Sequence, residues 1–322
     1  MPAQSNIAGT TSGNFIKLDN QILAVYSREI LFQAQPNLRF ASVFQRKEDL
    51  MATPGNQITF LRYNPLTGKS ELAETTPIST QAMSTGTTSI GVTEHGIAIQ
   101  VSELLLRQSC DDVMTRASQL LGMHYAKDMD RLCRDTLLTS ANVLWAKNRA
   151  NRAALTATDY FDVSLIRDSV EQLAIRKAPK FGDAYICFVH PHQSRRLKDD
   201  PAWVNITDYA QPGNFLTGEI GRIDDVRFVE STMVTKIPAG TQNIWGDNED
   251  TGDDTVIAAN ANTDVYQSVI VGDYCAGLAV GLDVEMRDNG VQDFGRQHAL
   301  AYYGIWGTGL IESGHVAVLE TA

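Results

Sequence analysis

Two closely spaced histidines have the residue type and spacing that could bind a metal ion. His190 and His192 flank Pro191, and paired imidazoles are common in zinc sites. Pro191 restricts the backbone between them, and the basic stretch 195–198 disfavours a nearby cation. We therefore interpret the segment as the end of a strand that enters a helix, and we predict no metal site.

An acidic loop, DNEDTGDD at 247–254, offers the oxygen ligands that calcium prefers. Counted from Asp247, Gly252 takes the sixth place of an EF-hand loop, but the twelfth place is Ala258 rather than a bidentate glutamate. No helices are expected on either side of the loop. We interpret it as a solvated loop, and weak cation binding stays an open hypothesis.

Short catalytic motifs are missing from the sequence. It contains no HExxH, GxSxG or Walker loop. Gly307-Thr308-Gly309 begins like a dinucleotide fingerprint, but Glu312 stands where the third glycine should be, so we predict a turn. The four cysteines are widely spaced without a CxxC pair, which favours reduced, buried thiols: Cys110, Cys133, Cys187 and Cys275. We predict no catalytic, cofactor-binding or metal-binding residue.

Composition narrows the class of protein further. The chain has 322 residues, 43% of them hydrophobic, and a formal net charge of -11. This charge argues against a protein that grips nucleic acid through lysine and arginine, although an acidic wall can still enclose DNA. No signal peptide and no stretch of ~20 apolar residues is present, so we expect a cytoplasmic product without membrane insertion.

The strongest periodic pattern predicts one long helix from about Ser102 to Asn142, with Ser102 as its N-cap and Gly122 as a weak point. Charged residues, Arg134 among them, are expected on its wet side. Its apolar residues recur at three- and four-residue steps: Leu106, Cys110, Val113, Ala117, Leu120, Leu121, Tyr125, Met129, Leu132, Cys133 and Leu137.

Shorter helices and strands are expected after this helix. A helix over 162–176 should turn Ile166, Val170, Leu173 and Ala174 inward, and Pro191 can open another helix over 192–198. Alternating apolar residues predict strands at 184–189, around Phe228, at 265–271, at 299–305 and at 316–318.

A long polar segment, Gln57 to Glu103, precedes the long helix. Ile58 and Phe60 alternate with polar residues, as do Ile97, Ile99 and Val101, so we predict that these two half-buried strands pair and flank a polar centre. A loop of this length with so little apolar surface is uncommon inside a compact domain. One solution is that it lies on another subunit.

The same segment carries a family resemblance. It contains Arg62, Pro65-Leu66, Gly68-Lys69 and Glu71-Leu72-Ala73-Glu74, followed by the run 96–102. A second set of residues, 218–224, leads into 226–230. In the order and spacing of these parts, the chain resembles the coliphage-N-four-type major capsid proteins of tailed phages.

The resemblance implies an α+β structure with the Hong Kong 97-type capsid fold, whose peripheral domain contains a long spine helix. The expected parts are an N-terminal arm with short helices (1–54), an extended β-hairpin loop (55–101), the peripheral domain with the spine helix (102–154), the axial domain (155–271) and the peripheral return strands (272–322).

The implied function is that of a major capsid protein. Its hexamers and pentamers would close an icosahedral shell around double-stranded DNA, in a virion assembled in the bacterial cytoplasm. Scaffolding, portal and decoration proteins are possible partners, and DNA would be enclosed without sequence-specific binding. The alternatives are an encapsulin-like nanocompartment shell and a hydrolase on an α+β scaffold.

The resemblance also suggests which residues contact a neighbouring subunit. We expect the tip of the extended loop, 65–85, to make that contact through noncovalent interactions only. The residues predicted at this contact are Arg62, Pro65, Gly68, Lys69, Glu71 and Glu74.

Overall fold

The computed structural model describes residues 39–52, 55–63, 66, 80, 82–104, 113–200, 219–240, 260 and 263–322. The chain divides into two units, of which the first comprises Met1–Asn37, Glu94–Asp128 and Leu282–Ile305 and the second comprises the remaining segments. Several sequence predictions fall outside the described residues: the arm up to residue 38, Cys110, and the acidic loop 247–254.

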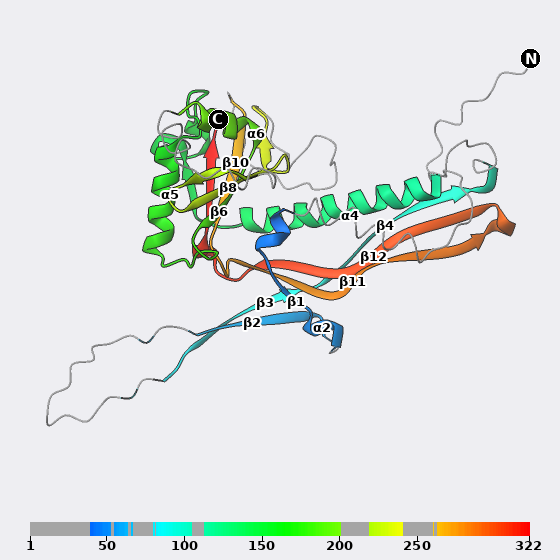
Figure 1. The fold of residues 1–322 in the computed structure, drawn as a ribbon. Coiled ribbons are helices and arrows are strands. Elements are labelled where there is room, and N and C mark those ends of the chain that lie inside the picture. Colours follow the sequence, from blue (N-terminus) through cyan, green and yellow to red (C-terminus); the bar gives the residue numbers. More distant parts are fainter. Residues whose placement is uncertain are drawn as a thin grey trace, which may run out of the picture. The chain divides into compact units, whose positions relative to one another are not determined.

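A seven-stranded sheet forms the centre of the second unit (Figure 1). Six strands follow the order β5-β13-β10-β6-β8-β7, and β9 pairs with β10. The strands are β5 (Val143–Trp145), β6 (Tyr185–Val189), β7 (Glu219–Ile223), β8 (Val226–Glu230), β9 (Thr235–Ile237), β10 (Val265–Val271) and β13 (Val316–Thr321). All residues of β10 are buried, as expected for a central strand covered on both faces. The predicted strands at 184–189, 265–271 and 316–318 are confirmed.

Side-chain caps define the two helices beside this sheet. Asp162 caps α5 (Val163–Ile175), because its carboxylate accepts a hydrogen bond from the Leu165 N–H at 2.9 Å. Ile166 and Leu173 are buried as predicted, whereas Ala174 is exposed because it lies on the solvent side of the last turn.

The histidine pair lies at the start of α6 (Pro191–Lys198). His190 Nδ1 accepts a hydrogen bond from the His192 N–H, and the Gln193 side chain accepts one from the His190 N–H. Both imidazoles lie against the Tyr266 ring, with centroids 4.9 and 5.0 Å away. The interpretation as a strand end entering a helix is therefore confirmed.

The segment 219–230 of the family resemblance is a β-hairpin formed by β7 and β8. Asp224 and Asp225 form its turn with φ angles of 42° and 66°. Two consecutive residues at positive φ are typical of a type I′ turn, and aspartate tolerates this conformation better than most residues. The local sequence therefore directs this hairpin.

The extended loop contains a strand that the sequence did not predict. β2 (Gln57–Tyr63) pairs antiparallel with β3 (Thr85–Gly91), so that Ile58 lies opposite Ile90. The predicted pairing of Ile58 and Phe60 with Ile97 and Ile99 is therefore wrong, since the latter two lie in β4 (Thr93–Ser102), which pairs with β12. β3 reads TGTTSIG, in which β-branched threonines suit an open two-stranded ribbon without apolar alternation.

The long helix is confirmed as α4 (Val113–Leu138), 26 residues that belong partly to each unit. It ends four residues before the predicted end at Asn142. The predicted N-cap, Ser102, is instead the last residue of β4 (Thr93–Ser102), and residues 105–112 lie outside the described part of the chain. Its predicted apolar face is largely buried: Ala117, Leu121, Tyr125, Met129, Cys133 and Leu137.

Two side chains of α4 differ from the prediction. Leu120 is 56% exposed although its spacing placed it on the apolar face. Arg134 is only 2% exposed although it was expected in solvent. It is buried with partners, because its guanidinium donates to Asp135 Oδ1 at 2.8 Å and to the Met233 carbonyl at 3.0 Å.

A second sheet has the strand order β1-β11-β12-β4. Its further strands are β1 (Gln45–Lys47), β11 (Ala276–Gln292) and β12 (Gln297–Leu310). Within the first unit, the His124 imidazole and the Tyr302 hydroxyl are hydrogen-bonded at 2.9 Å, and burial raises the pKa of Tyr302. This contact attaches α4 to β12.

Gly307 and Gly309 lie inside β12, so the turn predicted at 307–309 is wrong. A Cβ on Gly307 would collide with the Gly91 carbonyl oxygen, and one on Gly309 would lie 2.8 Å from the Ile90 side chain. Glycine at these positions allows β12 and the end of β3 to approach closely.

The five predicted parts of the chain stay a prediction. β5 and β13 share a sheet with β6 and β10, so this sheet crosses the expected boundaries of the axial domain at 154 and 271.

Cys133, Cys187 and Cys275 have free thiols, and all three side chains are buried, as predicted. Within the described part of the chain, no helix has the length and apolar character needed to cross a membrane.

Candidate subunit-contact site

The root of the β2–β3 ribbon is anchored by a small apolar cluster. Ile58, Phe60 and Ile90 are each at most 4% exposed and pack with Ala279 of β11. Gly277 leaves room for this packing, because a Cβ there would lie 2.5 Å from Phe60 Cζ. The Lys47 ammonium covers the outer side of the Phe60 ring at 4.5 Å from its centroid. These contacts hold the root of the ribbon.

Beyond Phe60, four large apolar side chains of the extended loop that the structure describes are open to solvent. Leu61 and Tyr63 are each 65% exposed, Leu66 72% and Met83 71%. Along β2, Ile58 and Phe60 lie on the buried face, so Leu61 and Tyr63 lie on the opposite face. Exposed apolar side chains also occur elsewhere, such as Ile175 and Phe294, but on this segment they lie beyond a buried root, which favours a surface that a partner covers.

Sequence reasoning missed this apolar set. The available signal was the run Phe60-Leu61-Arg62-Tyr63, which places large residues on both faces of a strand. Of the predicted contact residues, Pro65, Gly68, Lys69, Glu71 and Glu74 lie outside the described residues, and only Arg62 can be placed.

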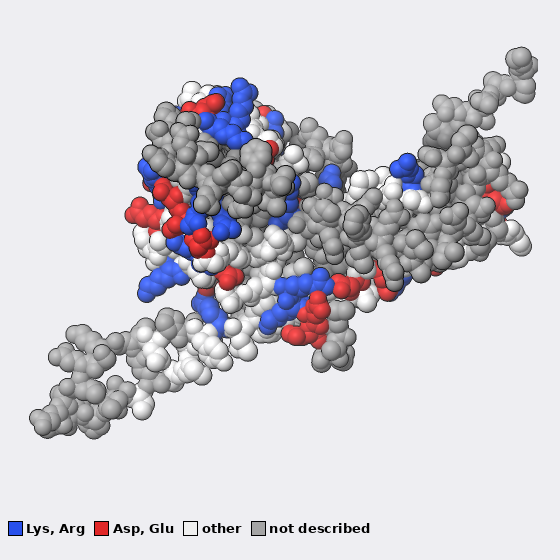
Figure 2. Space-filling model, viewed as in Figure 1, with Lys and Arg blue, Asp and Glu red and all other residues white. Residues whose placement is uncertain are grey.

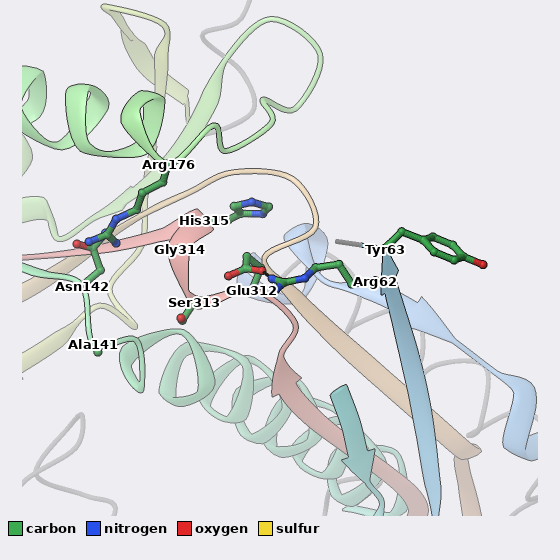
Figure 3. A pocket seen from close by; sticks show the side chains of 9 residues that line it. All are labelled: Arg62, Tyr63, Ala141, Asn142, Arg176, Glu312, Ser313, Gly314 and His315. Carbon is green, nitrogen blue, oxygen red and sulfur yellow. Dashed lines mark ion pairs between the residues drawn. The ribbon is translucent and has the colours of Figure 1, made fainter. Parts of the chain in front are cut away.

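Arg62 forms an ion pair with Glu312 of its own chain (Figure 3). The pair lies at a pocket of about 630 Å³ lined by residues 62–63, 141–142, 176 and 312–315. In Figure 3 the Arg62 guanidinium points toward Glu312, whereas the Tyr63 ring points away from the pocket. Arg62 therefore makes a contact within its own chain, whereas Tyr63 is exposed.

A buried carboxylate holds the chain where the described residues begin. Asp130 of α4 is 1% exposed, and its Oδ1 accepts hydrogen bonds from the N–H groups of Arg39 and Phe40 at 2.9 and 2.8 Å. Phe40 stacks on Phe188 with ring centroids 4.3 Å apart. Burial raises the pKa of Asp130 to about 6, although these backbone hydrogen bonds and Arg134 act in the opposite direction.

A second buried carboxylate, Asp159, is fully paired. Arg149 donates to it with two nitrogens at 2.9 and 3.2 Å, and the Thr156 N–H donates at 2.9 Å. Burial alone would raise the pKa of Asp159, but these hydrogen bonds outweigh it and hold the pKa well below its usual range.

The charges on the visible face show no dominant sign. Figure 2 shows basic and acidic side chains interspersed over the described surface, while the described stretch of the extended loop is mostly uncharged. Among the residues that the structure describes, no group of three or more His, Cys, Asp or Glu side chains could hold a metal ion.

Comparison with known structures defines the fold. The capsid of Ralstonia phage GP4 matches with a TM-score of 0.69 and 14% identity over 99% of this chain and 95% of that one. The Cyanophage Pam1 capsid matches with a TM-score of 0.69 and 14% identity over 99% of each chain. A virus-like particle from Pyrococcus furiosus matches with a TM-score of 0.53 and 10% identity over 92% of this chain and 98% of that one. The chain therefore has the Hong Kong 97-type capsid fold, as predicted.

The family follows from a sequence match. The model of the phage capsid protein family matches residues 85–318, and the chain belongs to this family. No curated protein matches the chain. The predicted role as a shell-forming major capsid protein of a tailed phage is confirmed, and neither the nanocompartment nor the hydrolase alternative is favoured.

Proposed function

We propose that the chain assembles into hexamers and pentamers of an icosahedral shell that encloses double-stranded DNA without sequence-specific contacts. Assembly takes place in the cytoplasm of the bacterial host, with separate scaffolding, portal and decoration proteins. The role is structural rather than catalytic. The family match supports the shell, and the formal net charge of -11 suits a wall that does not grip the DNA.

The observation that carries the assembly proposal is the contrast between the buried and the exposed parts of the extended loop. The segment 57–91 of this loop is called the arm from here on. Its root is buried against β11, while Leu61, Tyr63, Leu66 and Met83 expose their apolar side chains. Full burial of one such side chain contributes about 1.5–3 kcal/mol. We infer that a neighbouring subunit covers this part of the arm, and that repetition over the shell makes a modest contact sufficient.

The polar residues of the arm add register to this contact. Lys69, Glu71 and Glu74 would supply this register, and exposed ion pairs there contribute only ~0–1 kcal/mol each. Pro65 and Gly68 keep their proposed place at the interface. Arg62 has a different role in the proposal, since its pairing with Glu312 ties the root of the arm to its own chain.

The first experiment is negative-stain electron microscopy of the chain expressed alone, combined with analysis of the nucleic acid and protein in the particles. Closed shells, tubes or capsomer rings support the proposal, and an enzyme cargo in place of DNA would support the nanocompartment. A stable monomer that also fails to assemble with scaffold would contradict it.

Variants of the arm test the contact directly. The double substitution Leu61→Ser/Tyr63→Ser should leave the thermal midpoint of the unassembled chain unchanged but reduce the yield of closed shells. Tyr274→Ser is the matched control, because Tyr274 is also exposed, at 54%. Deletion of Pro65 to Thr85 should give a folded chain that cannot close shells, and normal particles from this deletion would refute the role of the arm.

A further inference from the structure

The pocket beside the root of the arm has rigid walls. The Ser140 hydroxyl donates to the carbonyl of Ser313 at 3.1 Å, and the Asn142 amide donates to the carbonyl of Val316 at 3.0 Å. The N–H groups of Ile311 and Glu312 donate to the Cys275 carbonyl at 2.9 and 3.2 Å. The turn after α4 and the segment 312–315 are therefore fixed before any ligand arrives.

Two guanidinium groups line this pocket beside one carboxylate. Arg62 is paired with Glu312, whereas Arg176 forms no ion pair with any residue that the structure describes. Arg176 belongs to the same corner as Glu312, since a Cβ on Gly314 would lie 3.6 Å from Glu312 Oε1 and 3.8 Å from Arg176 Cδ. With one carboxylate for two guanidiniums, the lining has an excess of one positive charge.

His315 supplies a further polar group without adding charge at neutral pH. Its Nδ1 is 3.0 Å from the Asp273 carbonyl oxygen, which fixes the ring. Burial and the nearby Arg62 lower the pKa of His315, despite hydrogen bonds to the backbone that act in the opposite direction. The neutral imidazole can therefore take part in hydrogen bonds at the pocket without repelling the arginines.

We propose that this pocket binds an oxyanion, with Arg176 as its principal contact and Arg62 as a second. A planar guanidinium matches the two oxygens of a carboxylate or phosphate, and the lining leaves one guanidinium without a carboxylate partner among the described residues. A volume of about 630 Å³ accommodates either a free phosphate or an acidic side chain of a second copy of the chain.

The Arg62–Glu312 ion pair, which ties the root of β2 to the segment 312–315, lies at the same pocket. Binding of free phosphate does not depend on the proposed shell. Binding of an acidic side chain from a second copy of the chain does rest on it.

The test uses the full chain in its unassembled state and inorganic phosphate as the probe. Phosphate should raise the thermal midpoint relative to chloride at the same ionic strength. Arg176→Gln should weaken phosphate binding on the order of tenfold or more, since hydrogen bonds to charged groups are strong, while Arg176→Lys should retain part of it. Arg195→Gln, an exposed arginine of α6 outside the pocket, is the matched control and should bind like the original chain.

The second part of the test concerns assembled shells. If the ligand is a carboxylate of a second copy, phosphate will not shift the midpoint, but shells of Arg176→Gln will dissociate at lower salt than those of Arg195→Gln. Equal midpoints in phosphate and chloride together with equal salt resistance of the two shells would overturn the proposal. An equal phosphate shift in Arg176→Gln and Arg195→Gln would also overturn it, because binding would then lie elsewhere. Neither result would bear on whether the chain forms shells.

Discussion

Replacing Asp130 by asparagine should change how the stability of the unassembled chain depends on pH. The carboxylate is buried in α4, and one of its oxygens accepts the N–H groups of Arg39 and Phe40. Its other oxygen, Oδ2, has no hydrogen-bond partner among the described residues. An asparagine carbonyl can accept the same two hydrogen bonds, so the substitution removes the charge and keeps the anchor.

The magnitude follows from the pKa of Asp130, which burial raises from 3.8 to about 6. A raised pKa means that the folded chain retains a proton that the unfolded chain has already released between these two pH values. The free energy of unfolding therefore contains a contribution that is complete below about pH 4 and is lost as the pH rises through about 6. The shift corresponds to about 3 kcal/mol.

Urea unfolding at pH 4 and pH 7.5 measures this contribution. From the lower to the higher pH, Asp130→Asn should gain about 3 kcal/mol relative to the original chain, whatever other groups titrate. Glu171→Gln, at an exposed position of α5, controls for general charge effects. Asp130→Ala leaves the N–H groups of Arg39 and Phe40 without their acceptor and should cost about 2–4 kcal/mol in addition. A difference that is flat with pH, or one in which asparagine loses stability as pH rises, would refute the reasoning.

Two further substitutions test packing and pairing. Gly307→Ala should destabilise the chain by about 2–4 kcal/mol in urea, because its methyl group would meet the Gly91 carbonyl oxygen, whereas Gly91→Ala should be tolerated, since its Cβ would have no neighbour closer than 3.9 Å. Equal losses in both would show that β12 has room at Gly307. Asp159→Asn should cost about 2–3 kcal/mol at pH 7, because it removes the ionic partner of Arg149. This loss should shrink as the pH falls below about 4, because the unfolded original chain then takes up a proton on Asp159 that the folded chain, with its lowered pKa, still resists. A loss that stays constant down to pH 2 would contradict that account.

Local signals in the sequence were sufficient for the helices and for most buried strands. Asp162 and Pro191 mark helix starts through interactions within one turn, so α5 and α6 lie close to where they were predicted. The alternation along 265–271 similarly indicated the central strand β10. Such signals depend on residues a few positions apart, which the chain order already brings together.

The candidate site was only partly predictable for the same reason. The polar extended loop and the family resemblance indicated a contact between subunits, but the exposed apolar set at Leu61 and Tyr63 was missed. Its recognition requires knowing which face of β2 is buried, and that depends on β11, more than 200 residues further along the chain.

The sequence by itself determined the family, the long amphipathic helix and the lack of a known catalytic motif, because these are properties of residue types and short spacings. Only the tertiary structure decided that β2 pairs with β3, that Arg134 and Asp130 are buried, and that Arg62 and Arg176 share a pocket. Each of these depends on segments that are distant in sequence. Their approach is determined by how the whole chain buries its apolar surface, which no local pattern records.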